Sequence, residues 1–92
     1  MTTTDSIIEE RGKTYGDFNE GIELEATILG AIAARYEQHH KKEMPMVVAL
    51  YFSKIAMKLS RLSITPDHID SWADIAGYAR LVELQLKKEE NA

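Results

Sequence analysis

Apolar residues recur at helical spacing along almost the whole chain, and this periodicity restricts the protein to an all-α fold. In the segment 18–39, the repeat is carried by Phe18, Ile22, Leu29, Ile32 and Tyr36. Residues separated by three or four positions lie on the same face of a helix, as burial against a neighbouring helix requires. No segment shows a convincing strand pattern. We therefore predict a compact bundle of three long helices preceded by a short N-terminal helix.

Capping residues and glycines place the boundaries of the first two helices. The first is expected over Thr4–Arg11, with Gly12 as the residue that stops it. The second is expected over Phe18–His39, where Asp17 and Glu20 form a capping box.

Two prolines mark the starts of the other two helices, because proline is common in the first turn of a helix. Pro45 begins a helix that should reach about Leu62, and Thr65 caps a fourth helix in which Pro66 is the first residue. The fourth helix should reach about Lys87 and fray into a charged tail, so that about residues 4–86 are ordered. Its buried face is predicted to consist of Ile69, Trp72, Ala76, Ala79 and Val82.

Length and charge limit the protein class. The 92 residues form a single domain, and their formal net charge of −4, with only 11 Lys and Arg, argues against duplex nucleic acid as the main partner. No cysteine is present, which excludes disulfides and thiolate chemistry. The polar N-terminus lacks the pattern of a secretion signal, and no apolar run approaches the roughly 20 residues of a membrane span. The expected location is the cytoplasm, that of the host cell if the gene belongs to a phage.

A chain this short buries a modest core, and many such domains gain stability by oligomerising. Val47, Leu50 and Met57 lie off the main apolar stripe of the third helix, which predicts a homo-oligomer, most simply a dimer. Gly30, inside the second helix, indicates that another helix crosses close by.

Acidic and basic residues are matched in number and spacing on the third and fourth helices. Asp67, Asp70 and Asp74 share one helical face, and so do Lys54, Lys58 and Arg61. A short connection makes the two helices antiparallel neighbours. Arg61 is then expected near Asp67 and Asp70, and Lys58 or Lys54 near Asp74.

Two interpretations of these charges remain open. One is an interhelical ladder of ion pairs that sets the helix register. The other is a site in which Mg²⁺ is held by Asp70 and Asp74, with Glu20 and Glu23 of the second helix as further ligands. In that site the basic side chains would contact the phosphate groups of a ligand.

A second candidate site precedes the second helix. Arg11, Lys13 and Tyr15 accompany two glycines there, and free amides at a helix N-terminus with cations nearby can bind an anion. The spacing matches neither the P-loop nor the dinucleotide fingerprint, and ordinary turn chemistry also explains the glycines.

Three blocks of sequence resemble a family of small phage and prophage proteins without an established function. The blocks cover residues 10–18, 58–62 and 67–79, and the third is the most specific. More remotely, the layout is similar to the all-α nucleotide pyrophosphohydrolases of the MazG and dimeric dUTPase type. That resemblance implies carboxylate-bound Mg²⁺ beside a nucleoside triphosphate. The chain departs from the usual motifs of those enzymes, because Glu9 and Glu10 lack a third glutamate and Asp70 to Asp74 is one residue too long.

Two functions are consistent with these features. In the first, the protein binds a nucleotide or another phosphorylated ligand, and is either a degenerate or an active Mg²⁺-dependent pyrophosphohydrolase. The residues expected to contact the ligand are Arg11, Lys13, Tyr15, Lys54, Lys58 and Arg61. The second is a non-enzymatic phage inhibitor that binds a host defence protein through an acidic surface.

Overall fold

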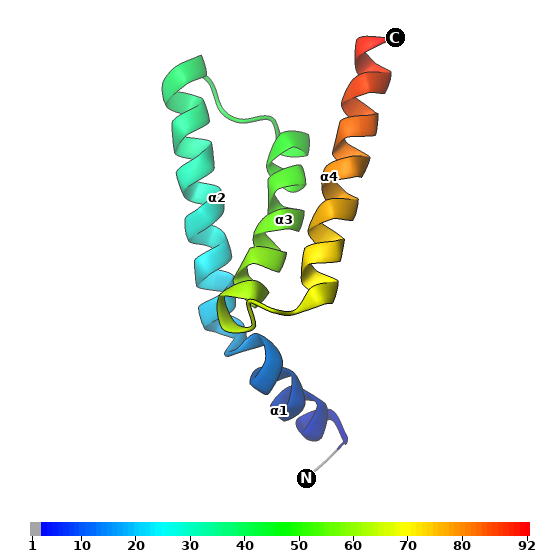
Figure 1. The fold of residues 1–92 in the computed structure, drawn as a ribbon. Coiled ribbons are helices and arrows are strands. Elements are labelled where there is room, and N and C mark those ends of the chain that lie inside the picture. The colour runs from blue at the N-terminus through cyan, green and yellow to red at the C-terminus, as the bar shows by residue number, and fades with distance from the viewer. Residues whose placement is uncertain (1–2) are drawn as a thin grey trace.

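The computed structural model describes residues 3–92, which form four helices and no strand. They are α1 (Thr3–Tyr15), α2 (Phe18–His40), α3 (Met46–Ile64) and α4 (Ile69–Glu90). Helix α3 lies between α2 and α4, and α1 projects from the end where α2 begins and α3 ends (Figure 1). Helices α2 and α4 pack against α3 and not against each other. The all-α prediction is confirmed, but the three long helices form an open layer in place of the expected compact bundle.

Helix α1 is longer than predicted and ends at a different glycine. It runs through Gly12 to Tyr15, and Gly16 then adopts a positive φ of 80°. The amide of Gly16 donates to the carbonyl of Gly12 at 2.9 Å, as in a helix that is closed by one residue in the left-handed conformation. A Cβ atom at Gly16 would lie 2.8 Å from Cγ1 of Ile64, so glycine also allows the chain to pass close to α3. The prediction of a stop at Gly12 was therefore wrong, because a single glycine costs a helix too little to end it.

The predicted start of α2 is confirmed. The side chain of Asp17 accepts a hydrogen bond from the backbone amide of Glu20 at 3.0 Å, which satisfies one of the free donors of the first turn. At its other end, α2 reaches His40 and is closed by Lys41 in the left-handed conformation.

Helix α4 begins later than predicted, because Thr65 and Pro66 belong to the connection and not to the helix. Thr65 ends α3, with its amide donating to the carbonyl of Arg61 at 3.0 Å, and His68 is the first boundary residue of α4. The carbonyl of Pro66 accepts a hydrogen bond from Nε1 of Trp72 at 2.8 Å. Asp67 consequently lies in the turn, outside the helical face that Asp70 and Asp74 share.

The face that α4 turns toward α3 also differs from the prediction. Ile69 and Trp72 are 79 % and 53 % exposed, whereas Ser71 is fully buried. The half-buried residues of α4 are Ile75, Tyr78 and Val82. Val82 is thus the one residue of the predicted face that is half-buried, and the other four are exposed. The prediction missed the rotation of α4 that follows when the small Ser71 lets the two helices approach closely.

Small residues mark the contact of α2 with α3 as well. The hydroxyl of Ser60 donates to the carbonyl of Gly21 at 3.1 Å, and a Cβ atom at Gly21 would lie 3.1 Å from that hydroxyl oxygen. Gly30, in contrast, has no neighbouring helix close to it, since a Cβ atom there would meet nothing within 4 Å apart from its chain neighbours and the nearby backbone of α2. The helix crossing predicted at Gly30 therefore does not occur within one chain.

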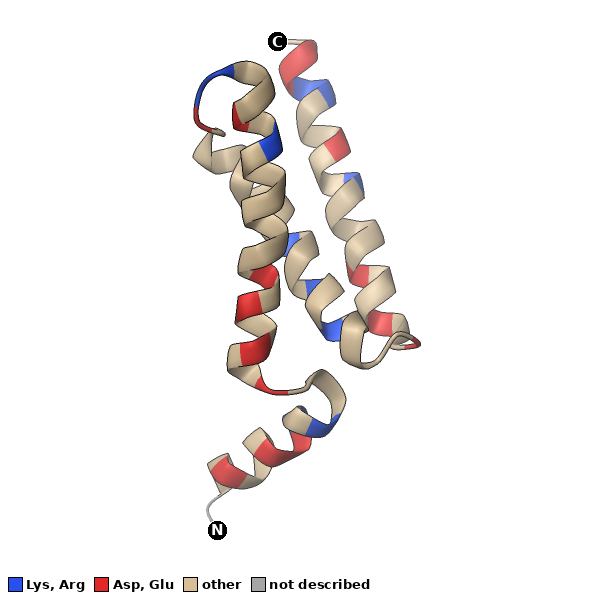
Figure 2. Cartoon of the chain, turned by 90° about the vertical axis from the view of Figure 1, so that its left-hand side faces the viewer, with Lys and Arg blue, Asp and Glu red and all other residues tan. Residues whose placement is uncertain are grey.

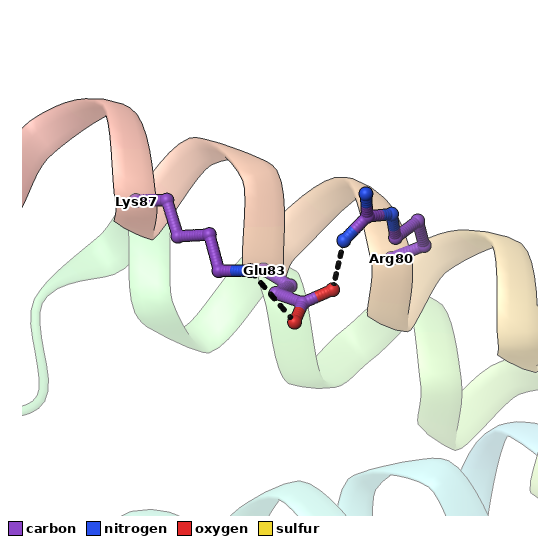
Figure 3. A network of polar contacts seen from close by, with 3 residues as sticks. All are labelled: Arg80, Glu83 and Lys87. Carbon is purple, nitrogen blue, oxygen red and sulfur yellow. Dashed lines mark hydrogen bonds and ion pairs between the residues drawn. The ribbon is translucent and has the colours of Figure 1, made fainter.

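The outer half of α4 carries charged side chains that stabilise it locally. Glu83 pairs with Arg80 and, at 3.3 Å, with Lys87 (Figure 3). The hydrogen bonds from Arg80 and Lys87 lower the pKa of the Glu83 carboxyl below its ordinary value. The helix continues to Glu90, beyond the predicted end at Lys87. None of the helices in residues 3–92 combines the length and the apolar character that crossing a membrane requires.

Candidate functional site

Tyr15, the last residue of α1, lies at the centre of a group of cationic and polar side chains. The guanidinium of Arg61, from α3, lies over its ring with Cζ 4.6 Å from the centroid, and that of Arg11 lies 5.0 Å from it. The ring of His68 meets the Tyr15 ring edge-on, with the centroids 5.6 Å apart. A ring attracts cations through the negative potential of its face, so Tyr15 holds a guanidinium group from α1 and another from α3. We call Arg11, Tyr15, Arg61 and His68 the tyrosine cluster.

Hydrogen bonds hold the segments of the tyrosine cluster in place. The hydroxyl of Thr65 donates to the carbonyl of Thr14, which joins the end of α3 to the end of α1. The Nδ1 atom of His68 lies 2.7 Å from the hydroxyl oxygen of the buried Ser71, in the first turn of α4. The site is therefore built where α1 and α3 end and α4 begins.

The positive charges of the tyrosine cluster have no carboxylate partner in the part of the chain that the structure describes. The ion pairs found there join Lys58 to Asp74, and Glu83 to its two neighbours on α4, and neither arginine takes part in one. Arg11 is exposed and Arg61 is half-buried. Arg61 does not make the ion pairs with Asp67 and Asp70 that the sequence predicted. Two guanidinium groups that contact the same ring and have no counter-ion form a local positive charge that an anion can neutralise.

A groove of about 190 Å³ opens beside Tyr15, between the start of α2 and the end of α3. It is lined by Tyr15, Asp17, Glu20, Gly21, Leu24, Ser60, Ser63 and Ile64. The carboxylates of Asp17 and Glu20 make the groove unsuitable for an anion. These carboxylates can accept hydrogen bonds from hydroxyl groups. The groove therefore favours the hydroxyl-bearing part of a ligand, and the arginines beside it favour an anionic part.

The matched charges of α3 and α4 form one ion pair and not a ladder among residues 3–92. Nζ of Lys58 lies 2.8 Å from Oδ2 of Asp74, and the side chains are 8 % and 49 % exposed, respectively. Lys54 and Asp70 are exposed and form no ion pair within the described residues. The predicted approach of Lys58 to Asp74 is confirmed, and the other predicted rungs are not formed.

The four carboxylates predicted as metal ligands do not meet in one chain. Glu20 and Glu23 are on α2, Asp70 and Asp74 are on α4, and these helices lie on opposite sides of α3. Within residues 3–92, no three His, Asp or Glu side chains are grouped as a metal site requires. These residues therefore do not fit a Mg²⁺ site within a single chain.

Charge is distributed unevenly along the molecule (Figure 2). Acidic residues follow one another along α1 and the first half of α2, and the basic residues of α3 lie between the acidic stretches of α2 and α4. Of the predicted ligand-binding residues, the structure brings together Arg11, Tyr15 and Arg61. Lys13 is exposed in the last turn of α1, and Lys58 is occupied by Asp74.

Spacing along the sequence predicted Thr65 as a helix cap and indicated no role for Ser71. A hydroxyl at the end of a helix usually suggests a cap for the next helix, whereas Thr65 bonds to a segment 51 residues earlier. The available signal for Ser71 was its position three residues after His68, since such residues are neighbours at the start of a helix.

Comparison with known proteins gives the family. Residues 1–85 match the model of DUF6378, described as a domain of unknown function. The chain belongs to this family. It is also 34 % identical over 92 residues to the Gene 55 protein of Mycobacterium phage L5, an alignment that covers 98 % of this chain and 54 % of that protein. The chain thus spans about half the length of this relative. No solved structure matches the chain. These findings support a phage protein of unknown function within DUF6378.

Proposed function

We propose that this DUF6378 domain binds a phosphorylated ligand, of the nucleotide class, at the tyrosine cluster. The observation that carries the proposal is the pair of guanidinium groups over Tyr15 with no carboxylate partner among the described residues. Arginine matches phosphate in both charge and geometry, because its planar fork donates two parallel hydrogen bonds. In a chain with a net charge of −4, this positive group offers an anion a defined place to bind.

The groove beside Tyr15 extends the proposal from phosphate to nucleotide. A phosphate bound to Arg11 and Arg61 would leave the rest of the ligand beside the groove, where Asp17 and Glu20 can accept hydrogen bonds from sugar hydroxyls. Tyr15 lines the groove and also supports both guanidinium groups, so it would connect the two halves of the site.

We propose binding and not hydrolysis. Metal-assisted attack of water on a phosphoanhydride needs carboxylates that hold Mg²⁺ beside the phosphates. Glu20 and Glu23 are separated from Asp70 and Asp74 by α3, which leaves a single chain without such a set among its described residues.

The test is a thermal-shift titration with a nucleoside triphosphate, with and without Mg²⁺. By mass action, a bound ligand at free concentration L stabilises the folded state by RT ln(1 + L/Kd), so the melting temperature rises with the logarithm of the ligand concentration once this exceeds Kd. We expect Arg61→Gln and Arg11→Gln to abolish the shift. Arg80→Gln, which removes the same charge from the exposed surface of α4, should keep it. Equal shifts in the wild type and in Arg61→Gln would refute the assignment.

A second candidate function is supported by the acidic surface of α1 and α2. Glu9, Glu10 and Glu23 are exposed, and none of them makes an ion pair within residues 3–92. Such a surface suits a basic partner, as a phage inhibitor of a host defence protein would require. Salt-sensitive co-purification of one host protein, lost in Glu20→Lys/Glu23→Lys and kept in Arg61→Gln, would favour this function over the first.

A further inference from the structure

The described chain exposes too much surface for a compact monomer. Its accessible surface is 7149 Å², whereas a folded monomer of this mass exposes roughly 5,400 Å². Its radius of gyration is 16.1 Å, against roughly 12 Å expected for this length. The difference in area, roughly 1,700 Å², lies within the range that one protomer buries in an obligate dimer.

Large apolar side chains account for much of this surface. Among the described residues, the only buried apolar side chains are Ala56 and Leu62. One strip follows α2 at helical spacing and contains the exposed Phe18, Ile22 and Ala26 and the half-buried Leu29 and Ala33. A second strip follows α3 and contains Met46, Val47, Leu50 and Met57. Phe18, Met46 and Leu50 are 79 %, 73 % and 52 % exposed, respectively.

The two strips lie on the same side of the layer. Gly21 and Ser60 mark the line where α2 and α3 touch. On each helix the strip lies roughly a quarter turn from that line, in the same rotational sense along the chain. In an antiparallel pair such as α2 and α3, this places both strips on one side. We call the two strips together the α2–α3 face.

Gly30 lies at the edge of the α2–α3 face, one turn after Ala26. It occupies the interior of a helix, where glycine is destabilising, and apart from its chain neighbours and the nearby backbone of α2, no atom of the described residues lies within 4 Å of the missing Cβ atom. Small residues on an exposed helix permit the close approach of another helix, and within one chain no such helix arrives.

We propose that a second copy of the chain covers the α2–α3 face. On α2 the face alternates the small Ala26 and Ala33 with larger apolar residues, and on α3 it carries larger side chains on either side of the exposed Lys54. In a two-fold interface, the same patch meets itself in reverse, so the small residues of one copy can receive the large residues of the other.

The experiment compares two substitutions of equally exposed leucines. Leu50 is in the α2–α3 face and Leu86 is near the end of α4, and both are 52 % exposed. Sedimentation equilibrium at micromolar concentrations should give twice the chain mass for the wild type and for Leu86→Glu. Leu50→Glu should weaken self-association at least tenfold, with the helical circular dichroism retained.

A second measurement covers the case in which Leu50→Glu does not fold. The melting temperature of a dimer rises with protein concentration, because association stabilises only the folded chain. A wild-type melting temperature that is constant over a hundredfold range of concentration, with the mass of a monomer, would overturn the proposal and leave the face to a foreign partner. A dimer dissociated by Leu86→Glu and not by Leu50→Glu would overturn it as well.

Discussion

The ammonium group of Lys58 lies 2.8 Å from the carboxylate of Asp74, and it is among the least exposed groups of the described chain although it is charged. The pair joins α3 to α4 at a position where a helix layer would normally carry an apolar contact. Lys58 is nearly buried, whereas Asp74 remains half exposed. Removing Asp74 and removing Lys58 should therefore change the stability by different amounts.

Asp74→Ala should destabilise the protein by about 1–3 kcal/mol, because it leaves a nearly buried ammonium group without a counter-ion; a fully buried pair would lose about 3–5 kcal/mol. Asp67→Ala, in the exposed turn, should change the free energy of unfolding by less than about 0.5 kcal/mol. Urea denaturation of both variants measures the difference. Equal midpoints would contradict the role given to Asp74.

Replacing both members of the pair should restore stability. In Lys58→Met/Asp74→Leu no charge is left unpaired, so much of the loss seen in Asp74→Ala should be recovered. The double variant should also keep the thermal shift with nucleotide, since Lys58 is not assigned to the ligand site. Loss of that shift in a stable double variant would return Lys58 to the site.

Gly16→Ala should destabilise the protein by about 1–3 kcal/mol, because alanine disfavours a positive φ and its Cβ atom would meet Ile64 at 2.8 Å. Gly12→Ala, inside α1 and one turn before Gly16, is the matched control. It has open space around it, and the gain in helix propensity should stabilise the chain by about 0.5–1 kcal/mol. Thermal unfolding of both variants checks the opposite signs, and a stabilising Gly16→Ala would show that α1 ends differently.

Thr65→Val should loosen α1 from the end of α3, since it removes the hydroxyl that donates to the carbonyl of Thr14. The expected loss is about 0.5–1.5 kcal/mol, with faster hydrogen exchange at residues 12–16. Thr27→Val removes a hydroxyl that bonds within its own helix, to the carbonyl of Glu23. It should leave hydrogen exchange at residues 12–16 unchanged. Identical exchange in Thr65→Val and the wild type would argue against this contact.

The Glu83 carboxyl should titrate below its ordinary pKa, and Arg80→Gln should raise its pKa again, because the hydrogen bond from Arg80 is the main cause of the lowering. Because the pKa of Glu83 is lower in the folded than in the unfolded state, its carboxylate contributes fully to the free energy of unfolding at pH values above the ordinary pKa of glutamate. This contribution is lost as the pH falls through the lowered value. Carboxyl chemical shifts followed by NMR between pH 2 and 7 measure both values. An unchanged Glu83 pKa in Arg80→Gln would contradict the assigned cause.

Local signals in the sequence determined the helices themselves. Helical spacing of apolar residues predicted the three long helices, capping residues and a glycine predicted the short first helix, and the capping pair of Asp17 and Glu20 predicted where α2 begins. Such signals act between residues a few positions apart, so the sequence displays both partners. The same reasoning failed at Thr65 and Pro66, whose usual place at a helix start was overridden by the contact of Thr65 with Thr14.

Only the tertiary structure decided which faces meet and which charges are paired. Matched spacing on α3 and α4 allowed three ion pairs, and the structure forms the one between Lys58 and Asp74. The grouping of Arg11 and Arg61 over Tyr15 depends on a contact between segments about 50 residues apart, which spacing along one helix cannot encode. The physical reason is that the rotation of each helix follows from the closest approach of small residues, such as Ser71 and Gly21, and apolar periodicity alone does not reveal where that approach occurs.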